Sequence, residues 1–205
     1  MSAGVGPIVV TERLVLRPFS DVDQAPFFAL NTHPAVVESL GQSPTRAESD
    51  DMMERYSAEM AREGWGLWAV GEAFEGGAGF VGMVGLHRVR PELPCAPAVE
   101  IGWRLHPDQW GQGYATEAAA AALRFGFENA RLTEIVAFTT TLNTRSQAVM
   151  ARIGMRRDVD GDFDHPSVPE GSPLRRHVLY RTTAEGGGAE ARAAGWSEGH
   201  SRPLP

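Results

Sequence analysis

The sequence contains a single cysteine, Cys95, in 205 residues. A lone thiol excludes an internal disulfide and a thiolate metal cluster, and it suits a reducing compartment. The chain also lacks any run approaching the roughly eighteen apolar residues of a membrane-spanning helix, and its first residues do not resemble a secretory signal. We therefore expect a cytoplasmic protein that has no membrane segment and holds no metal ion.

Positive charge is scarce as well. The chain has 19 Lys and Arg against 26 Asp and Glu, which gives a formal net charge of −7. No basic stripe is available to displace counterions from phosphates, so we do not expect nucleic-acid binding. Hydrophobic residues make up 42 % and charged residues 22 %. These values are typical of a globular protein and exclude wholesale disorder and a long coiled coil.

Hydrophobic periodicity predicts an α+β fold around one central sheet. The expected strands cover residues 9–19, 65–70, 79–87, 98–105, 134–141, 159–163 and 177–183. The expected helices cover residues 20–30, 45–62, 113–129 and 143–153. The strands at 65–70, 79–87 and 98–105 are short and separated by Gly- and Pro-rich turns, which indicates an antiparallel meander. The helix at 113–129 has the strongest signal, because it contains five consecutive alanines and no proline.

The composition changes after Thr183. Small and charged residues dominate the remaining segment, and Trp196 and Leu204 are almost its only large apolar side chains. Such a segment buries too little surface to offset its ordering entropy. We expect one domain over residues 1–183 and a flexible Gly/Ala-rich tail over residues 184–205.

A glycine-rich turn precedes the alanine-rich helix and is the most informative motif. Gly111 and Gly113 leave the N–H donors at the helix start open to an anion. A nucleotide P-loop is excluded because no Gly-Lys-Ser/Thr ending follows, and a dinucleotide fingerprint is excluded because Thr116 replaces its third glycine. The remaining ligand is coenzyme A. A turn that only caps a packing helix is the alternative.

Further runs carry a family resemblance: Glu100 to Trp103, Trp110 to Ala118, Asn143 to Ser146 and Ile153 to Met155. Together they resemble the GNAT superfamily of acetyl-CoA-dependent N-acetyltransferases, and more closely its Rim-type branch, which acetylates ribosomal-protein N-termini. The run Thr11 to Arg17 and the ending Leu179-Tyr180-Arg181 are similar to the same branch, so the resemblance covers residues 9–183. Trp110 stands where the superfamily usually has Arg or Gln. The same replacement is typical of the Rim-type branch.

The resemblance implies a single GNAT domain with a mixed, mostly antiparallel sheet flanked by helices. It places acetyl-CoA between two splayed strands, expected at 98–105 and 134–141. The implied contacts to acetyl-CoA are Trp103, Arg104, Leu105, Trp110, Gly111, Gln112, Gly113, Tyr114, Ala115, Thr116 and Asn143. The Tyr114 side chain is expected to pack under the loop, and Asn143 also suits a helix N-cap.

Three candidate catalytic residues follow from the same resemblance. Glu100 stands where several GNAT enzymes place a glutamate, so it is the first candidate for the base that frees the amine. His165 is the second candidate, since its loop is expected to border the acceptor pocket. Ser146 matches the serine of the branch's Asn-x-x-Ser motif and is the candidate acid. The structural alternatives are a solvated or salt-bridged strand residue for Glu100, a solvated loop residue for His165, and a hydroxyl that bonds to the helix backbone for Ser146. Cys95 lies in a proline-rich turn, which favours direct transfer.

The leading interpretation is therefore an acetyl-CoA-dependent N-acetyltransferase acting on a primary amine, with a protein N-terminus as one acceptor. The alternatives are a small-molecule acceptor (an aminoglycoside, a polyamine or an amino acid) and a catalytically silent acyl-CoA sensor. The loop at 164–176 is expected to choose the acceptor, and its Asp164 and Glu170 to attract a cationic one. A homodimer through the terminal strand or the Met-rich helix is a further expectation.

Overall fold

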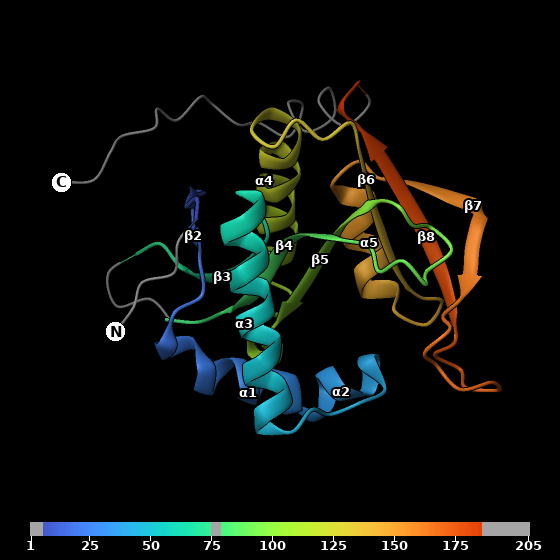
Figure 1. Ribbon diagram of the computed structural model, residues 1–205, viewed down its shortest axis with the longest axis horizontal. Helices are drawn as coiled ribbons and strands as arrows, with labels where there is room; N and C mark the ends of the chain where they lie inside the picture. Colours follow the sequence, from blue (N-terminus) through green and yellow to red (C-terminus); the bar gives the residue numbers. More distant parts are fainter. Residues whose placement is uncertain (1–5, 75–78, 186–205) are drawn as a thin grey trace.

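The computed structural model describes residues 6–74 and 79–185, and its elements form one eight-stranded sheet flanked by helices (Figure 1). The strands are β1 (Val9–Val10), β2 (Leu14–Arg17), β3 (Leu67–Glu72), β4 (Gly82–Arg88), β5 (Val99–Leu105), β6 (Glu134–Thr140), β7 (Arg156–Asp164) and β8 (Arg176–Thr183). Their order is β1-β2-β3-β4-β5-β6-β8-β7. Only β5 and β6 are parallel, and the other neighbours are antiparallel. The expected α+β fold with a mixed, mostly antiparallel sheet is confirmed.

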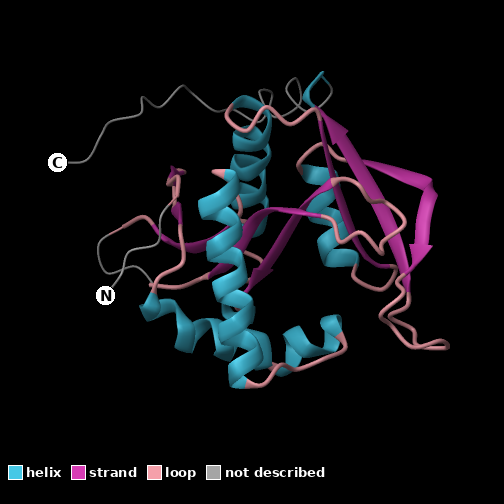
Figure 2. Cartoon of the chain, viewed as in Figure 1, coloured by secondary structure: helices cyan, strands magenta, loops and turns pink. Residues whose placement is uncertain are grey.

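The helices are α1 (Gln24–Thr32), α2 (Pro34–Leu40), α3 (Arg46–Glu63), α4 (Tyr114–Glu128) and α5 (Thr144–Arg152), with short 3-10 turns at Asp21–Asp23 and Pro107–Gln109. Figure 2 shows how they surround the sheet. In the described ranges, no helix is long and apolar enough to cross a membrane. The expected tail lies outside the described residues except for Ala184 and Glu185.

Three details differ from the sequence prediction. The strand expected at 9–19 divides into β1 and β2, because the Thr11 N–H donates to the Leu14 carbonyl at 2.8 Å and turns the chain. Helix α2 was not expected, although Pro34 at its first position and the left-handed Gly41 after its end are ordinary helix signals. The last strand, β8, pairs with both β6 and β7, so β7 forms the sheet edge.

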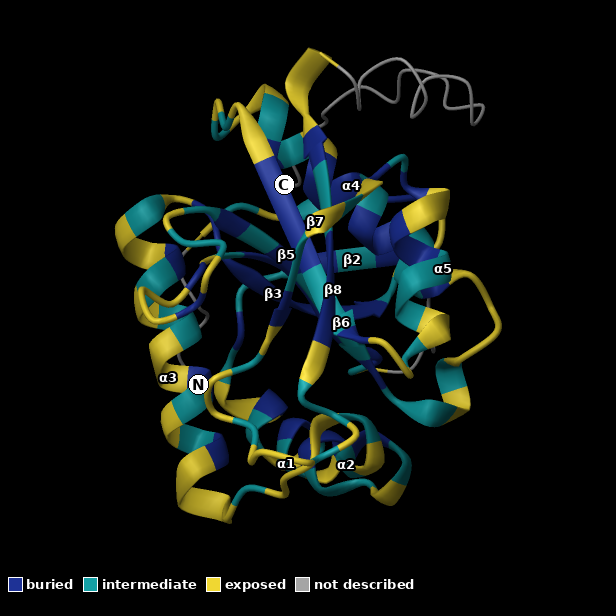
Figure 3. Ribbon diagram, turned by 90° about the vertical axis from the view of Figure 1, so that its right-hand side faces the viewer, coloured by how far each residue is buried: buried dark blue, intermediate teal, exposed yellow. Residues whose placement is uncertain are grey.

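The helices cover both faces of the sheet. Helices α4 and α5 pack over Leu86, Ile101 and Ile135, whereas α1 and α3 pack over the other face, against Ala69 and Met83. Figure 3 shows the buried sheet strands between these layers and the exposed outer side of α3. The alanine-rich sequence of α4 has a direct role here, because its small side chains let the helix lie close to the sheet.

Strands β5 and β6 share a single register pair, Glu100 with Val136. Beyond this pair, toward the C-terminal end of β5, the two strands separate. The expected splayed strand pair is therefore present, and it ends at one of the candidate catalytic residues. The separation leaves backbone groups of β5 without a strand partner on that edge.

Candidate active site

The turn before α4 forms an open anion site. Gly111 and Gly113 adopt left-handed backbone angles, φ +78° and +82°, which side-chain-bearing residues rarely adopt. Gly113 is the N-cap of α4 and provides no capping side chain, and the first helical bond runs from the Glu117 N–H to the Gly113 carbonyl. The N–H groups of Tyr114, Ala115 and Thr116 are thus the orphan donors of the helix start, where an anion binds favourably.

Two arginines from distant segments lie against this turn. The Arg13 guanidinium donates to the Gln112 carbonyl at 2.9 Å, and the Arg145 guanidinium lies 4.7 Å from the centre of the Trp110 ring. Between Leu105 and Arg124 the sequence itself has neither Lys nor Arg, so sequence reasoning treated the phosphate loop as free of basic side chains. No local signal identifies either arginine, because both reach the loop only through the tertiary fold.

Glu117 connects the first β-hairpin to α4. Its carboxylate accepts hydrogen bonds from the Thr11 hydroxyl at 2.6 Å and the Arg13 backbone N–H at 2.9 Å, and it pairs with the Arg13 guanidinium at 2.6 Å. Burial alone would raise the pKa of Glu117, but these hydrogen bonds outweigh it and hold the pKa below its usual range. The Tyr114 hydroxyl donates to Glu72 at 2.8 Å, so its side chain packs under the loop as expected.

Replacing Glu117 by glutamine is expected to lower the free energy of unfolding by about 1–3 kcal/mol at pH 7, because charge-assisted hydrogen bonds are lost in a partly buried site. A lowered carboxylate pKa stabilises the fold above the unfolded-state pKa. This stabilisation is lost as the pH falls through the folded-state value. The difference between wild type and variant should therefore shrink in acid, which urea unfolding at several pH values measures. Glu128→Gln, at an exposed position of the same helix, is the control. An equal deficit in acid and at neutral pH would contradict the ionic role.

The backbone of β5 presents hydrogen-bonding groups to the splay. Just beyond the two ends of β5, the Val89 N–H donates to the Ala98 carbonyl and the His106 N–H to the Val81 carbonyl, each at 2.9 Å. Because these bonds alternate along the strand, the peptide groups of the even-numbered residues of β5 face β4. Alternation along an antiparallel strand then directs the peptide groups of Trp103 and Leu105 toward the β6 edge. The Leu105 carbonyl is occupied by the Trp110 indole N–H at 2.9 Å. The Trp103 peptide groups and the Leu105 N–H remain to bind an extended ligand.

Glu100 lies at the start of the splay, on the sheet face that α1 and α3 cover. Its carboxylate is 3.3 Å from the His87 imidazole, and its side chain is 12 % exposed. Burial raises the pKa of Glu100 to about 7, although His87 and Arg90 act in the opposite direction. A carboxylate with this pKa can accept a proton near neutral pH and release it again. Gly102, two residues further on the same face, leaves the space beside Glu100 open, since a β-carbon there would meet only the His87 ring, at 3.8 Å.

Arg104 differs from its expected role. Its backbone pairs with Met83 of β4, and its side chain lies on the same face of β5 as that of Glu100, where both border a large open cavity. There its guanidinium donates a short hydrogen bond to the Asn31 side-chain carbonyl. The Tyr56 side chain of α3 lines the cavity as well, and burial raises the pKa of its hydroxyl. Sequence reasoning missed Asn31 and assigned Tyr56 only to a helix face, because nothing local indicates that either meets β5.

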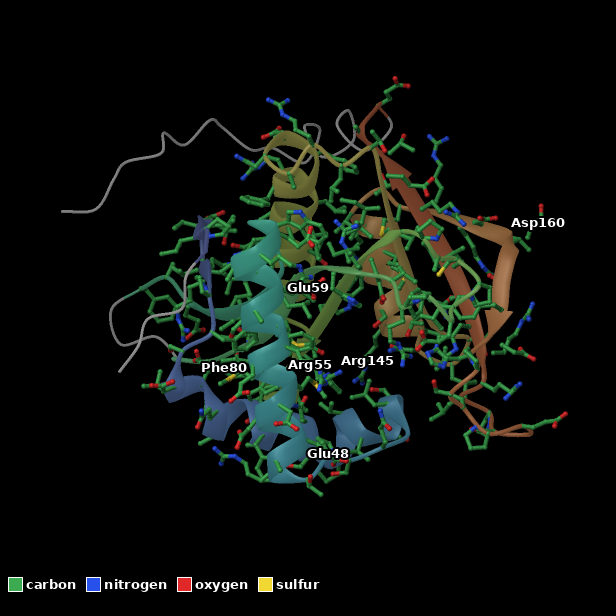
Figure 4. The ribbon with its side chains drawn as sticks, viewed as in Figure 1. Glu48, Arg55, Glu59, Phe80, Arg145 and Asp160 are labelled. Carbon is green, nitrogen blue, oxygen red and sulfur yellow. The ribbon has the colours of Figure 1, made fainter. Side chains whose placement is uncertain are left out.

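The exposed part of α3 borders this cavity. Arg55 and Glu59 line it from α3, and Arg145 lines it from α5. In the view of Figure 4 the labelled Arg55 and Arg145 lie between these two helices. The Glu59 carboxylate accepts from the Arg88 backbone N–H at 3.2 Å, so it is anchored at the rim. The cavity therefore carries both signs of charge.

The Asn143 side chain accepts a hydrogen bond from the Ser146 backbone N–H at 3.1 Å. It is thus the N-cap of α5, the structural role that its position allowed. Ser146 is half-buried in the first turn of α5. Among the hydrogen bonds of the described residues, none joins Ser146 or His165 to Glu100 directly.

His165 belongs to an aromatic cluster at the end of the sheet. Its ring lies 5.0 Å from that of His177 and 6.4 Å from that of Phe163, and its Nε2 atom is 3.1 Å from the Arg90 guanidinium. Burial, His177 and Arg90 together lower the pKa of His165. Its imidazole therefore stays neutral to a lower pH than a solvent-exposed imidazole does.

In the acceptor loop, Asp164 lies 3.3 Å from the Arg176 guanidinium and 3.7 Å from that of Arg175. These exposed ion pairs offset part of its charge, and attraction of a cationic acceptor by Asp164 stays a prediction. Cys95 is half-buried, and burial raises the pKa of its thiol, which disfavours a nucleophilic thiolate. In the ranges 6–74 and 79–185, no group of His, Cys, Asp and Glu is placed to hold a metal ion.

Known proteins share this sequence and architecture. Residues 13–156 match the domain described as acetyltransferase (GNAT) domain. The chain is 30% identical over 192 residues to the FsC-acetyl coenzyme A-N(2)-transacetylase of Aspergillus fumigatus, covering 90% of this chain and 80% of that protein. An acetyltransferase (GNAT family) from Bacillus anthracis superimposes with a TM-score of 0.71 at 27% identity, covering 87% of this chain and 99% of that one. RimL, a ribosomal L7/L12 alpha-N-protein acetyltransferase solved with coenzyme A, shares the fold with a TM-score of 0.69 at 16% identity, covering 86% and 98%.

Proposed function

The chain belongs to the GNAT acetyltransferase family, and from this premise we propose that it transfers the acetyl group of acetyl-CoA directly to a primary amine, with Glu100 as the base. The observation that carries this proposal is a buried carboxylate with a pKa of about 7 at the point where β5 and β6 separate. A carboxylate in this state is ionised in about half of the molecules near neutral pH and can accept a proton from an ammonium group.

The residues present fit coenzyme A. The helix start at Gly113 suits a pyrophosphate, because a β-carbon at Gly111 would meet no atom within 4 Å and the Arg13 guanidinium lies beside Gly113. The Trp103 peptide groups and the Leu105 N–H suit the amides of the pantetheine arm. Asn143, the N-cap of α5, is the last of the proposed contacts.

Two side chains, Glu100 and Ser146, transfer the protons in the proposed reaction. A bond forms between the amine nitrogen and the acetyl carbon, and the carbon–sulfur bond of the thioester breaks. Glu100 takes the proton that the amine loses, and the Ser146 hydroxyl donates a proton to the departing sulfur and regains one from water. Glu100 returns its proton to solvent before the next turnover. Backbone N–H groups at the splay stabilise the negative charge that develops on the carbonyl oxygen.

The acceptor is proposed to be an α-type amine. One relative is named for transfer to an N(2) atom, and a protein with the same fold is named as an alpha-N-protein acetyltransferase. An α-amine has an unperturbed pKa of roughly 7.7–8.0, so its protonated form is in only modest excess at neutral pH. A base with a pKa of about 7 is therefore close enough in pKa to remove the proton. A homodimer and a cytoplasmic location stay predictions.

A silent acyl-CoA sensor is the competing function. It would need the phosphate turn but no base, whereas the buried Glu100 is retained here at a cost in stability. Thiol release from acetyl-CoA in the presence of amines and N-terminal peptides separates the two functions. Binding of acetyl-CoA without amine-dependent thiol release would identify a sensor.

Replacing Ser146 by alanine is expected to lower kcat by about a hundredfold, because the thiolate then departs without its proton donor. The Kd for acetyl-CoA should change little, since the Asn143 cap bonds to the Ser146 backbone and not to its hydroxyl. Single-turnover thiol release and calorimetry measure the two effects. Thr144→Ala removes an exposed hydroxyl from the same turn and is the control. An unchanged kcat in the Ser146 variant would assign the proton donor elsewhere.

A further inference from the structure

Arg104 is a half-buried cation that has no anionic partner among the residues that the structure describes. Among the described residues, its guanidinium donates a hydrogen bond to the neutral side-chain carbonyl of Asn31. Elsewhere in the chain the partly buried arginines meet carboxylates: Arg17 pairs with Asp23 and Arg181 pairs with Asp158, each at 2.6 Å. A partly desolvated charge without a counterion is unfavourable, so Arg104 is suited to an anionic partner from outside the chain.

The Arg104 side chain is held in place by a buried polar chain. Asn31 of α1 is fully buried, its carbonyl accepts from Arg104, and its amide donates to the Ser49 hydroxyl of α3 at 3.2 Å. Three elements, β5, α1 and α3, therefore fix the guanidinium. Burial lowers the pKa of Arg104, although Tyr56 acts in the opposite direction, and a guanidinium stays protonated at neutral pH even so. The arrangement orients a permanent cation and leaves its charge uncompensated.

Arg104 and Glu100 flank Gly102 on one face of β5. Four residues along a strand span about 13 Å between α-carbons, and both long side chains lie on the face of β5 that carries Gly102. The space between them lies over Gly102, which has no side chain. A proton acceptor at one end and a cation at the other match the two charged groups of a zwitterion.

We propose that Arg104 binds a carboxylate of the acceptor, so that this enzyme selects amines that also bear a carboxylate. The inference rests on the proposed acetyl transfer to an amine. Two sources share this chemistry: a free amino acid, and a peptide whose first side chain is acidic. Polyamines and aminoglycosides have no carboxylate and would meet the Arg104 charge unfavourably. The planar guanidinium suits a bidentate carboxylate contact.

The test compares matched acceptors that differ only in the carboxylate. L-leucine and L-leucinamide represent the free amino acid, and Asp-Ala-Ala and Asn-Ala-Ala represent the peptide. The ratio of kcat/KM within each pair is measured by thiol release in wild type, Arg104→Gln, Asn31→Asp and Arg62→Gln. Because a carboxamide also lowers the pKa of the amine, the change of the ratio between variants is the informative quantity.

Asn31→Asp is the most specific variant. It keeps the shape of the side chain, the Ser49 hydroxyl can rotate to donate to it, and it gives Arg104 an internal counterion. We expect the preference for the carboxylate to fall at least tenfold in Arg104→Gln and Asn31→Asp, for the amino-acid pair, the peptide pair or both. It should be unchanged in Arg62→Gln, which removes an exposed charge from α3. The pair that responds identifies the source of the carboxylate.

Two further readouts separate failure of this inference from failure of the proposed function. Thermal stabilisation by L-leucine and by Asp-Ala-Ala in the presence of coenzyme A reports acceptor binding without turnover, and at least one of them should stabilise wild type but not Arg104→Gln. Equal ratios in all variants, or no stabilisation by either carboxylate in wild type, would overturn the carboxylate site even where amines are acetylated. A weakened Kd for acetyl-CoA or a large loss of melting temperature in Arg104→Gln would do the same, because the side chain would then serve the cosubstrate or the fold.

Discussion

Replacing Glu100 by glutamine is expected to lower kcat/KM for the amine by about a hundredfold at pH 7, the usual contribution of a general base. In wild type, kcat/KM should rise with pH through a midpoint at about 7, where the Glu100 carboxyl loses its proton. Glutamine cannot titrate, so this limb should vanish. Activity should return in alkali, where the amine deprotonates without assistance. Thiol release measured from acid to alkaline pH gives both profiles.

Glu59→Gln is the matched control for this prediction. Glu59 is a carboxylate at the rim of the same cavity, anchored to the Arg88 backbone, and it has no proposed part in the chemistry. Its variant should keep the limb near pH 7. If Glu100→Gln keeps the wild-type profile, the base lies elsewhere, and His165 is the next residue to replace.

The same variant has a signature in stability that does not depend on turnover. A carboxyl whose pKa is raised from 4.5 to about 7 binds its proton more tightly in the folded protein than in the unfolded chain. Folding stability therefore falls as the pH rises between these two values, by about 3 kcal/mol at most. Glu100→Gln should lack this decline and exceed wild type in stability above pH 7. Parallel stability curves for the two proteins would contradict a raised pKa.

Replacing Gly113 by valine is expected to weaken acetyl-CoA binding by about a hundredfold or more. A branched side chain is strained at φ +82°, and its β-carbon would approach the Arg13 guanidinium to 3.4 Å beside the open amides of α4. The pyrophosphate would lose both its space and the geometry of its donors. Calorimetric titration with acetyl-CoA measures the loss.

Gly64→Val separates this effect from backbone strain. Gly64 has φ +74° at the end of α3, and a β-carbon there would meet no atom within 4 Å. Both variants should lose stability to a similar degree, by about 1–2 kcal/mol, because both place a side chain in a left-handed conformation. Only Gly113→Val should lose affinity. An unchanged Kd in that variant would remove the phosphate assignment.

The sequence predicted those features that local patterns determine. The alanine run predicted α4, and the two glycines predicted the turn before it. Short apolar runs between glycines and prolines predicted the meander of β3, β4 and β5. Helix α2 has a Pro34 start and a Gly41 end, but at seven residues it has too little periodicity to stand out.

What the sequence did not predict depends on contacts between distant segments. Arg13 and Glu117 are 104 residues apart, and Arg104 and Asn31 are 73 residues apart. Neither pair has a spacing that a motif could record. The raised pKa of Glu100 likewise depends on burial by α1 and α3, so the sequence could only nominate this residue through its family resemblance. The packing of the fold is what makes it a base.

The most direct test follows the acetyl group from acetyl-CoA in a single reaction. The purified chain is mixed with acetyl-CoA and the amine panel, and thiol release, acetylated product and the intact mass of the protein are measured together. The chain contains no lysine, so acetylation of its own side-chain amines cannot contribute to thiol release. The account predicts one acetylated amine for each coenzyme A released and an unmodified Cys95 at every time. Acetyl-CoA binding without thiol release for any amine, or an acetylated Cys95 that forms before the product, would contradict it.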